Sequence, residues 1–162
     1  LYERECDLAI AYAPPIQPRL EQQLLAEAGL VLVAPHGRFE AATGCVDLSA
    51  LDGVDMIGVI NSGPIGTIIA DALAKALVVP REVASVSTYY VAAALVRHGV
   101  GVAIVDEYTG RAMASAEVDL LRLSPSLPFA VHAVWLEDRP LSKLGLRFVK
   151  IVEQMLKRSA SL

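Results

Sequence analysis

Apolar residues occur in short runs along this chain, and turn-forming residues separate the runs. Residues 7–12 (DLAIAY) form one run, which ends before Pro14 and Pro15. A longer run covers residues 24–35 and ends at Pro35. Such bounded runs predict buried strands. The same pattern predicts further strands at residues 55–60, 82–86, 102–105, 120–123 and 129–135.

Stretches with helical character lie between and after these strands. They cover residues 65–77, 89–97, 109–116 and 141–157, and the last is the clearest amphipathic helix, because its apolar residues recur at helical spacing. Alternating strands and helices predict an α/β architecture with mostly parallel pairing. The element order also predicts a chain that leaves one lobe, builds a second and returns, giving two lobes joined by crossing strands.

Composition limits the classes of partner. The chain has 162 residues, of which 54% are hydrophobic and 20% charged, with a formal net charge of −4. Lys and Arg are scattered, so the chain by itself is not expected to bind nucleic acid through phosphate contacts. No apolar run reaches the roughly 18 residues of a membrane span. The first residues lack a signal-peptide pattern, and Cys6 and Cys45 are interpreted as reduced thiols of a cytoplasmic protein.

Signals for catalysis are weak. The sequence has no Gly-x-Ser-x-Gly elbow, phosphate-binding Walker loop or Gly-x-Gly-x-x-Gly fingerprint. His36, His98 and His132 have no metal-ligand spacing. We therefore expect a protein that is not an enzyme and holds no metal or cofactor.

Two predicted strand-to-helix junctions are candidates for ligand recognition. At the first, Ser62, Gly63, Pro64 and Ile65 begin a helix. Free N–H groups at a helix N-terminus favour a carboxylate, Ser62 would add a hydroxyl donor, and Gly63 permits close approach. The alternative is an ordinary helix cap and turn.

The second candidate junction comprises Ser85, Ser87 and Thr88. Ser85 and Ser87 share one face of an extended strand, which could face a ligand, whereas Thr88 is the expected N-cap of the helix 89–97. Asp106, at a further strand end, could hold a ligand ammonium group or cap the helix 109–116.

A series of motifs resembles the effector-binding domain of LysR-type transcriptional regulators. The series comprises the strand DLAI at residues 7–10, LxxExLxLVxPx-like residues 25–36, VDLSxL-like residues 46–57, EVxS at residues 82–85, LVxxGxGVxIV at residues 95–105 and VWxxxRPLS at residues 134–142. This series covers nearly the whole chain in the family's order. Residues 105–109 also resemble the end of the GxG-containing motif in those LysR-type regulators that respond to diaminopimelate and opines. Glu107 and Tyr108 depart from the residues that are common there.

The resemblance implies the type-2 periplasmic-binding-protein fold. Residues 34–135 would form the second lobe, and residues 1–33 with 136–162 an incomplete first lobe. The family has further strand–helix units and a winged helix-turn-helix DNA-binding domain before this point, so the chain is expected to be truncated at its N-terminus. By the same resemblance, Ala11, Tyr12 and Ala13 belong to the wall of the effector cleft.

The function implied is the sensing of a small carboxylate or amino-acid-like effector between the lobes. DNA would be bound only through the absent N-terminal domain, the protein would form a homo-oligomer (dimer or tetramer), and no membrane partner is expected. The alternative is a solute-binding protein of a transport system with the same fold.

Overall fold

The computed structural model describes residues 1, 6–40, 44–60 and 62–160, without the side chains of the last two. The chain divides into two compact units, one formed by Leu1–Ala28 with Phe129–Leu162 and the other by Gly29–Pro128. We call the first the split unit and the second the inserted unit. Each is described by itself.

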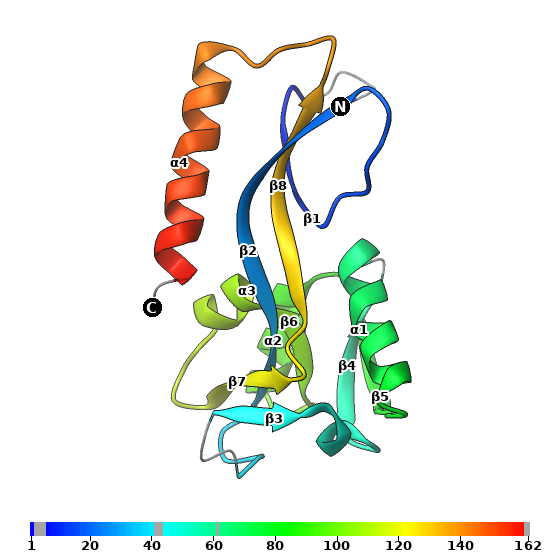
Figure 1. Cartoon of the computed structure of the whole chain (residues 1–162). Coiled ribbons are helices and arrows are strands. Elements are labelled where there is room, and N and C mark those ends of the chain that lie inside the picture. The colour runs from blue at the N-terminus through cyan, green and yellow to red at the C-terminus, as the bar shows by residue number, and fades with distance from the viewer. Residues whose placement is uncertain (2–5, 41–43, 61, 161–162) are drawn as a thin grey trace. The chain divides into compact units, whose positions relative to one another are not determined.

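The split unit is built on three strands and one long helix. Strand β1 (Ala9–Tyr12) pairs antiparallel with β8 (Pro128–Leu136), which in turn neighbours β2 (Leu20–Pro35). Helix α4 (Lys143–Ala160) lies along β2 and β8 (Figure 1). These elements meet at Leu25, Ala133 and Val149, which are at most 1% exposed.

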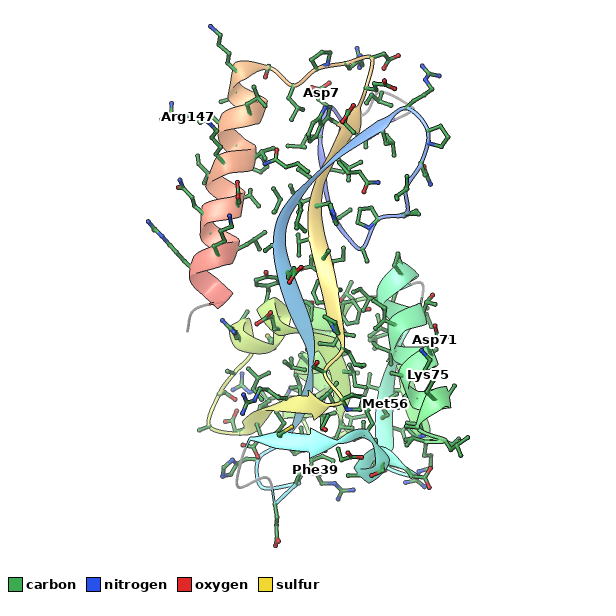
Figure 2. All side chains as sticks on the ribbon, viewed as in Figure 1. Asp7, Phe39, Met56, Asp71, Lys75 and Arg147 are labelled. Atoms are coloured by element: carbon green, nitrogen blue, oxygen red, sulfur yellow. The ribbon has the colours of Figure 1, made fainter. Side chains whose placement is uncertain are left out.

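Helix α4 has one buried and one exposed apolar stripe. Val149 packs against the sheet with the partly buried Val152 and Leu156, as expected for a helix with an apolar face at i, i+3 and i+7. A second stripe, formed by Leu144, Phe148, Ile151 and Met155, is 47–77% exposed. Arg147 projects from α4 on the side away from the strands (Figure 2). The split unit therefore buries only part of the apolar surface of its helix.

The inserted unit contains a mixed sheet. The second half of β2 pairs antiparallel with β6 (Ala103–Asp106) on one side and β7 (Val118–Ser124) on the other. Strand β3 (Cys45–Asp47) runs parallel to β7. On the β6 side, β4 (Asp55–Val59) and β5 (Arg81–Val86) form a parallel pair.

Short helices connect these strands. They are a 3₁₀ helix at Leu48–Leu51, α1 (Gly63–Lys75), α2 (Tyr89–Arg97) and α3 (Glu107–Ala112). Helix α2 packs Ala92, Ala93 and Val96 against Val33 and Val105 of the sheet, all of them fully buried. The inserted unit therefore has a continuous core.

Gly101 shows why the Gly-x-Gly turn precedes β6. The N–H of the next residue, Val102, donates to the carbonyl of Asp55, and the carbonyl of Val102 accepts from Ile57. A Cβ at position 101 would lie 2.6 Å from the Asp55 carbonyl oxygen. Gly99 has φ +74°, in the left-handed region that glycine adopts readily. The turn therefore needs glycine for two different reasons.

The expectation of mostly parallel pairing is wrong. Parallel pairing occurs in the β4–α1–β5 crossover, because such a unit imposes it, and between the short strand β3 and β7. The crossing strand β2 instead runs against its neighbours β6 and β7. Strand β3 was also missed, because its three residues follow a loop and carry no periodic signal.

The boundaries between the two units differ from the predicted lobe limits, which lay between residues 33 and 34 and between residues 135 and 136. In the structure one boundary lies between residues 28 and 29, inside β2, and the other lies between residues 128 and 129, at the start of β8. Residues 129–135 lie in the split unit because β8 pairs there with β1, and the ring of Phe129 lies 4.9 Å from that of Tyr12.

Candidate functional site

Three strand-to-helix junctions of the inserted unit lie at the carboxyl ends of β4, β5 and β6, which run in the same direction. Strands β4 and β5 are parallel and end side by side, with Val59 paired to Val86. A parallel bridge between Met56 and Val102 places the chain entering β6 beside β4 in the same direction. The carboxyl ends of parallel strands meet at one edge, where open α/β folds bind ligands. We call this the junction edge, and its residues are Ser62, Gly63, Pro64, Ile65, Ser85, Ser87, Thr88 and Asp106.

The first junction leaves a hydroxyl outside the helix cap. Ser62 occupies the N-cap position of α1, but its side chain makes no capping hydrogen bond. Its Oγ instead lies against Gly66, where a Cβ would come within 2.2 Å of it. Gly63 begins the helix with φ +56°, and Pro64 follows in the first turn without an N–H to satisfy. Ile65 is 2% exposed and contributes its side chain to the core.

The second junction follows the predicted cap. Thr88 Oγ1 accepts from the Val91 N–H at 3.2 Å, so its role as N-cap of α2 is confirmed. Ser85 lies on β5 opposite Gly58, and Ser87 follows the end of that strand. Both serines are exposed, which leaves their hydroxyls available to a ligand.

The third junction holds a buried carboxylate. Asp106 is 2% exposed, and its two oxygens accept from the Thr109 N–H at 2.9 Å and from Thr109 Oγ1 at 2.6 Å. The predicted helix cap is therefore confirmed, although α3 starts two residues earlier than expected. Contact between Asp106 and a ligand ammonium group stays a prediction.

Tyr89 is a candidate that the sequence did not reveal. It begins α2, its ring packs against the core, and its buried hydroxyl has no hydrogen-bond partner among the described residues. Burial raises the pKa of the Tyr89 phenol, the Ser62 hydroxyl acts in the opposite direction, and the Asp106 charge raises it further. Groups from both other junctions therefore act on this phenol. Its position directly after the predicted N-cap Thr88 was the available signal, but the sequence pattern indicated only that Tyr89 belongs to the helix 89–97.

Ala11, Tyr12 and Ala13 belong to the split unit. Ala11 and Tyr12 pair with His132 and Val131 of β8, while the Ala13 N–H donates to the Ala130 carbonyl at 2.7 Å. The structure therefore brings eight of the predicted site residues to the junction edge and places these three at the end of β1.

A model of the LysR substrate binding domain family matches residues 1–157 of the chain. The chain belongs to this family. Among its relatives, the HTH-type transcriptional regulator DgcR from a Pseudoalteromonas species is 34% identical over 142 residues, which are 88% of this chain and 49% of DgcR. The HTH-type transcriptional regulator AdmX from Serratia plymuthica is 28% identical over 154 residues, 95% of this chain and 47% of AdmX. The chain thus spans about half the length of these curated relatives.

Solved structures show the same fold. The CcmR regulatory domain of Synechocystis PCC6803, in complex with 2-PG, matches with a TM-score of 0.81 at 17% identity, over 95% of this chain and 75% of that one. An H2O2-bound Corynebacterium glutamicum OxyR C206S mutant matches with a TM-score of 0.80 at 15% identity, over 99% and 52% respectively. The predicted type-2 periplasmic-binding-protein-like α/β fold is confirmed.

Membership of the LysR family favours a regulatory domain over the alternative of a transport protein. The family is one of effector-binding regulatory domains and not of enzymes. Within the described part of the chain, no group of three or more His, Cys, Asp or Glu residues could hold a metal ion. No helix among those residues is long and apolar enough to cross a membrane.

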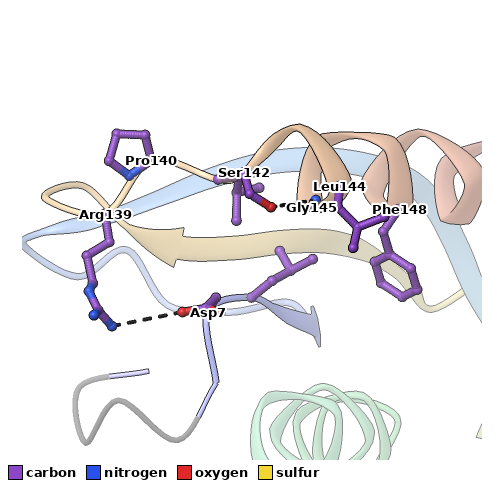
Figure 3. Close-up of a pocket in the computed structure, with 9 residues that line it drawn as sticks. Asp7, Arg139, Pro140, Ser142, Leu144, Gly145 and Phe148 are labelled. Atoms are coloured by element: carbon purple, nitrogen blue, oxygen red, sulfur yellow. Dashed lines mark hydrogen bonds and ion pairs between the residues drawn. The ribbon is translucent and has the colours of Figure 1, made fainter.

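The split unit has a pocket of about 620 Å³ where α4 begins. Figure 3 shows Ser142 Oγ accepting from the Gly145 N–H at 3.1 Å, beside an Arg139–Asp7 ion pair of 3.9 Å. Leu144 and Phe148 form its apolar side. Since the Ser142 hydroxyl caps the helix, we interpret this arrangement as a helix start and not as the effector site of the LysR domain.

Proposed function

We propose that this LysR-family domain senses a small carboxylate or amino-acid-like effector at the junction edge. The N-termini of α1 and α2 supply the positive ends of two helix dipoles, which favour a carboxylate. The exposed hydroxyls of Ser85 and Ser87 add polar contacts. Asp106 supplies negative charge on the same edge, as an amino-acid ammonium group would require.

The observation that carries the proposal is the pair of hydroxyls on Ser62 and Tyr89. Ser62 is not used as a helix cap. The buried Tyr89 hydroxyl makes no hydrogen bond of good geometry with the described residues, and the Ser62 side chain is the polar group that acts on it. Leaving a buried polar group unpaired costs about 1–3 kcal/mol. Such groups are uncommon in proteins unless they serve a function. Two hydroxyls near one another at an edge with two helix N-termini therefore support a polar ligand.

We further propose that the complete protein regulates transcription in the cytoplasm. Its named relatives are transcriptional regulators about twice as long as the matched region. DNA binding would belong to a segment outside this chain, and the regulator would act as a homo-oligomer. The effector would then work through a difference in affinity between two states of that assembly.

Thermal-shift measurements on this chain test the effector proposal. The compounds are L-alanine, L-glutamate, L-lysine, meso-diaminopimelate, octopine and benzoate. A compound present at about 100 times its dissociation constant stabilises the protein by about 2.7 kcal/mol. We expect Ser62→Ala to weaken the binding of that compound by at least about tenfold, because a hydrogen bond to a charged group contributes about 1.5–3 kcal/mol.

Ser115→Ala is the matched control. Ser115 is exposed, precedes β7 and contacts Glu117, so it contributes nothing to the junction edge. Equal affinity of the wild type and Ser62→Ala for a bound amino acid or octopine would contradict the proposed position of the site. A folded protein that is stabilised by none of the compounds would contradict the proposed effector class.

A further inference from the structure

A second pocket in the inserted unit has the dimensions of a small-molecule site. It encloses about 510 Å³, within the range of about 300–1,000 Å³ typical of ligand pockets. It lies between the first residues of β2 in this unit, strand β7 and helix α3. It shares no lining residue with the junction edge.

Most of this pocket is apolar. Side chains that are at most 8% exposed line it from β2, β7 and the segment after β7, namely Leu30, Val31, Leu121, Leu123 and Leu127. They offer a preformed surface to the apolar part of a ligand. Burial of such a part contributes about 25 cal/mol for each Å² removed from water.

One polar group of the pocket is held in a fixed position. Glu107 Oε1 accepts from the Gly29 N–H at 2.9 Å, and Oε2 accepts from Arg111 Nη2 at 2.8 Å. The Glu107 side chain is 15% exposed and that of Arg111 is 33% exposed. Since both Glu107 oxygens have donors, this carboxylate orients the Arg111 guanidinium at the pocket wall.

Arg111 retains hydrogen-bonding capacity. Its Nη1 is buried and has no hydrogen-bond partner among the described residues. A buried donor without an acceptor is unfavourable by about 1–3 kcal/mol, more when it is charged. Arg111 lines the pocket and one-third of its side chain is exposed, so its guanidinium is accessible to an acceptor there.

A second arginine lines the same pocket from β7. Arg122 lies on that strand opposite Val31 of β2 and Cys45 of β3, which also line the pocket. Arg111 and Arg122 each carry a positive charge and Glu107 carries a negative one. The charged side chains that line the pocket therefore sum to one positive charge. Guanidinium groups bind carboxylates through two parallel hydrogen bonds, which fixes the orientation of the ligand.

We propose that this pocket binds an amphipathic monocarboxylate. The carboxylate pairs with Arg111 and Arg122, and the apolar chain or ring lies against the leucines. The pocket is separate from the junction edge, so the domain would have a second ligand-binding site.

Two-dimensional amide NMR with octanoate as the probe tests the proposal, and 1-octanol is its uncharged counterpart. We expect octanoate to shift the amide signals of Gly29 and residues 121–124, and to bind at least tenfold more tightly than 1-octanol. Arg122→Gln removes an exposed charge and should preserve folding. We expect it to weaken octanoate binding about tenfold, the effect of losing one charge-assisted hydrogen bond.

Two further variants make the result specific. Arg111→Lys keeps the positive charge but loses the planar guanidinium group, which can donate two parallel hydrogen bonds to a carboxylate. It should therefore also weaken octanoate binding. Ser62→Ala should leave that binding unchanged. The proposal is overturned if octanoate does not bind, if 1-octanol binds equally well, if Arg122→Gln has no effect, or if Ser62→Ala abolishes binding.

Discussion

The inserted unit and the split unit differ in how much of their apolar surface they bury. In the inserted unit, Ile57, Val96 and Val105 belong to a continuous core. In the split unit, α4 packs through Val149 but exposes the stripe that contains Phe148 and Ile151. The inserted unit also carries the junction edge and the arginine-lined pocket. A continuous buried core and exposed polar groups are therefore found in the same unit, as expected for a preformed binding site.

The largest expected effect compares one isoleucine from each unit. Ile57 is 2% exposed and Ile151 is 47% exposed. We expect Ile57→Ala to lower the free energy of unfolding by about 2–5 kcal/mol because it leaves a cavity. Ile151→Ala should change it by less than about 0.5 kcal/mol. Urea denaturation measures both values, and equal losses would contradict the difference between the units.

Two glycines should respond in opposite directions. A Cβ on Gly101 would meet the Asp55 carbonyl oxygen at 2.6 Å, whereas the nearest atom to a Cβ on Gly145 of α4 lies at 3.4 Å. We expect Gly101→Ala to destabilise the protein by about 1–3 kcal/mol. Gly145→Ala should stabilise it by about 0.5–1 kcal/mol through helix propensity. Thermal unfolding of both variants shows whether each one is stabilised or destabilised. A stabilised Gly101→Ala variant would show that the turn does not need the close approach of residue 101 to the Asp55 carbonyl oxygen.

Tyr89→Phe should have the smallest effect on stability and the clearest pH signature. Removing an unpaired buried hydroxyl changes the free energy of unfolding by less than about 1 kcal/mol. Since burial raises the Tyr89 pKa, an unfolded tyrosine ionises first, at pH near 10. Stability therefore falls as the pH rises above about 10.

The Phe variant should lose stability less steeply than the wild type in that range. Denaturation at pH 8 and pH 11 measures the difference. Identical slopes would mean that the Tyr89 phenol ionises alike in both states.

Elements with strong local signals were predictable from the sequence. Thr88 and Asp106 were identified as N-cap candidates, because a cap depends only on neighbouring residues. Strand β2 starts four residues earlier than predicted, since Leu20 to Gln23 alternate weakly and acquire strand structure from pairing. The antiparallel pairing of β2 is a tertiary property, and apolar periodicity does not encode it.

The candidate site was predictable only in part. Ser62 and Ser85 stand in recognisable strand-to-helix turns, so they could be selected from the chain alone. Tyr89 required the packing of its ring and the environment of its hydroxyl. The pairing of Arg111 with Glu107 follows helical spacing, but their position beside Gly29 and Arg122 depends on how distant strands come together.

The most direct test of the central claim is an amide NMR map of this chain with the strongest carboxylate effector from the thermal-shift screen. The account predicts the largest shifts at residues 62–66, 85–91 and 106–109, at the three junctions. Shifts confined to residues of the split unit, with none at the junctions, would contradict it.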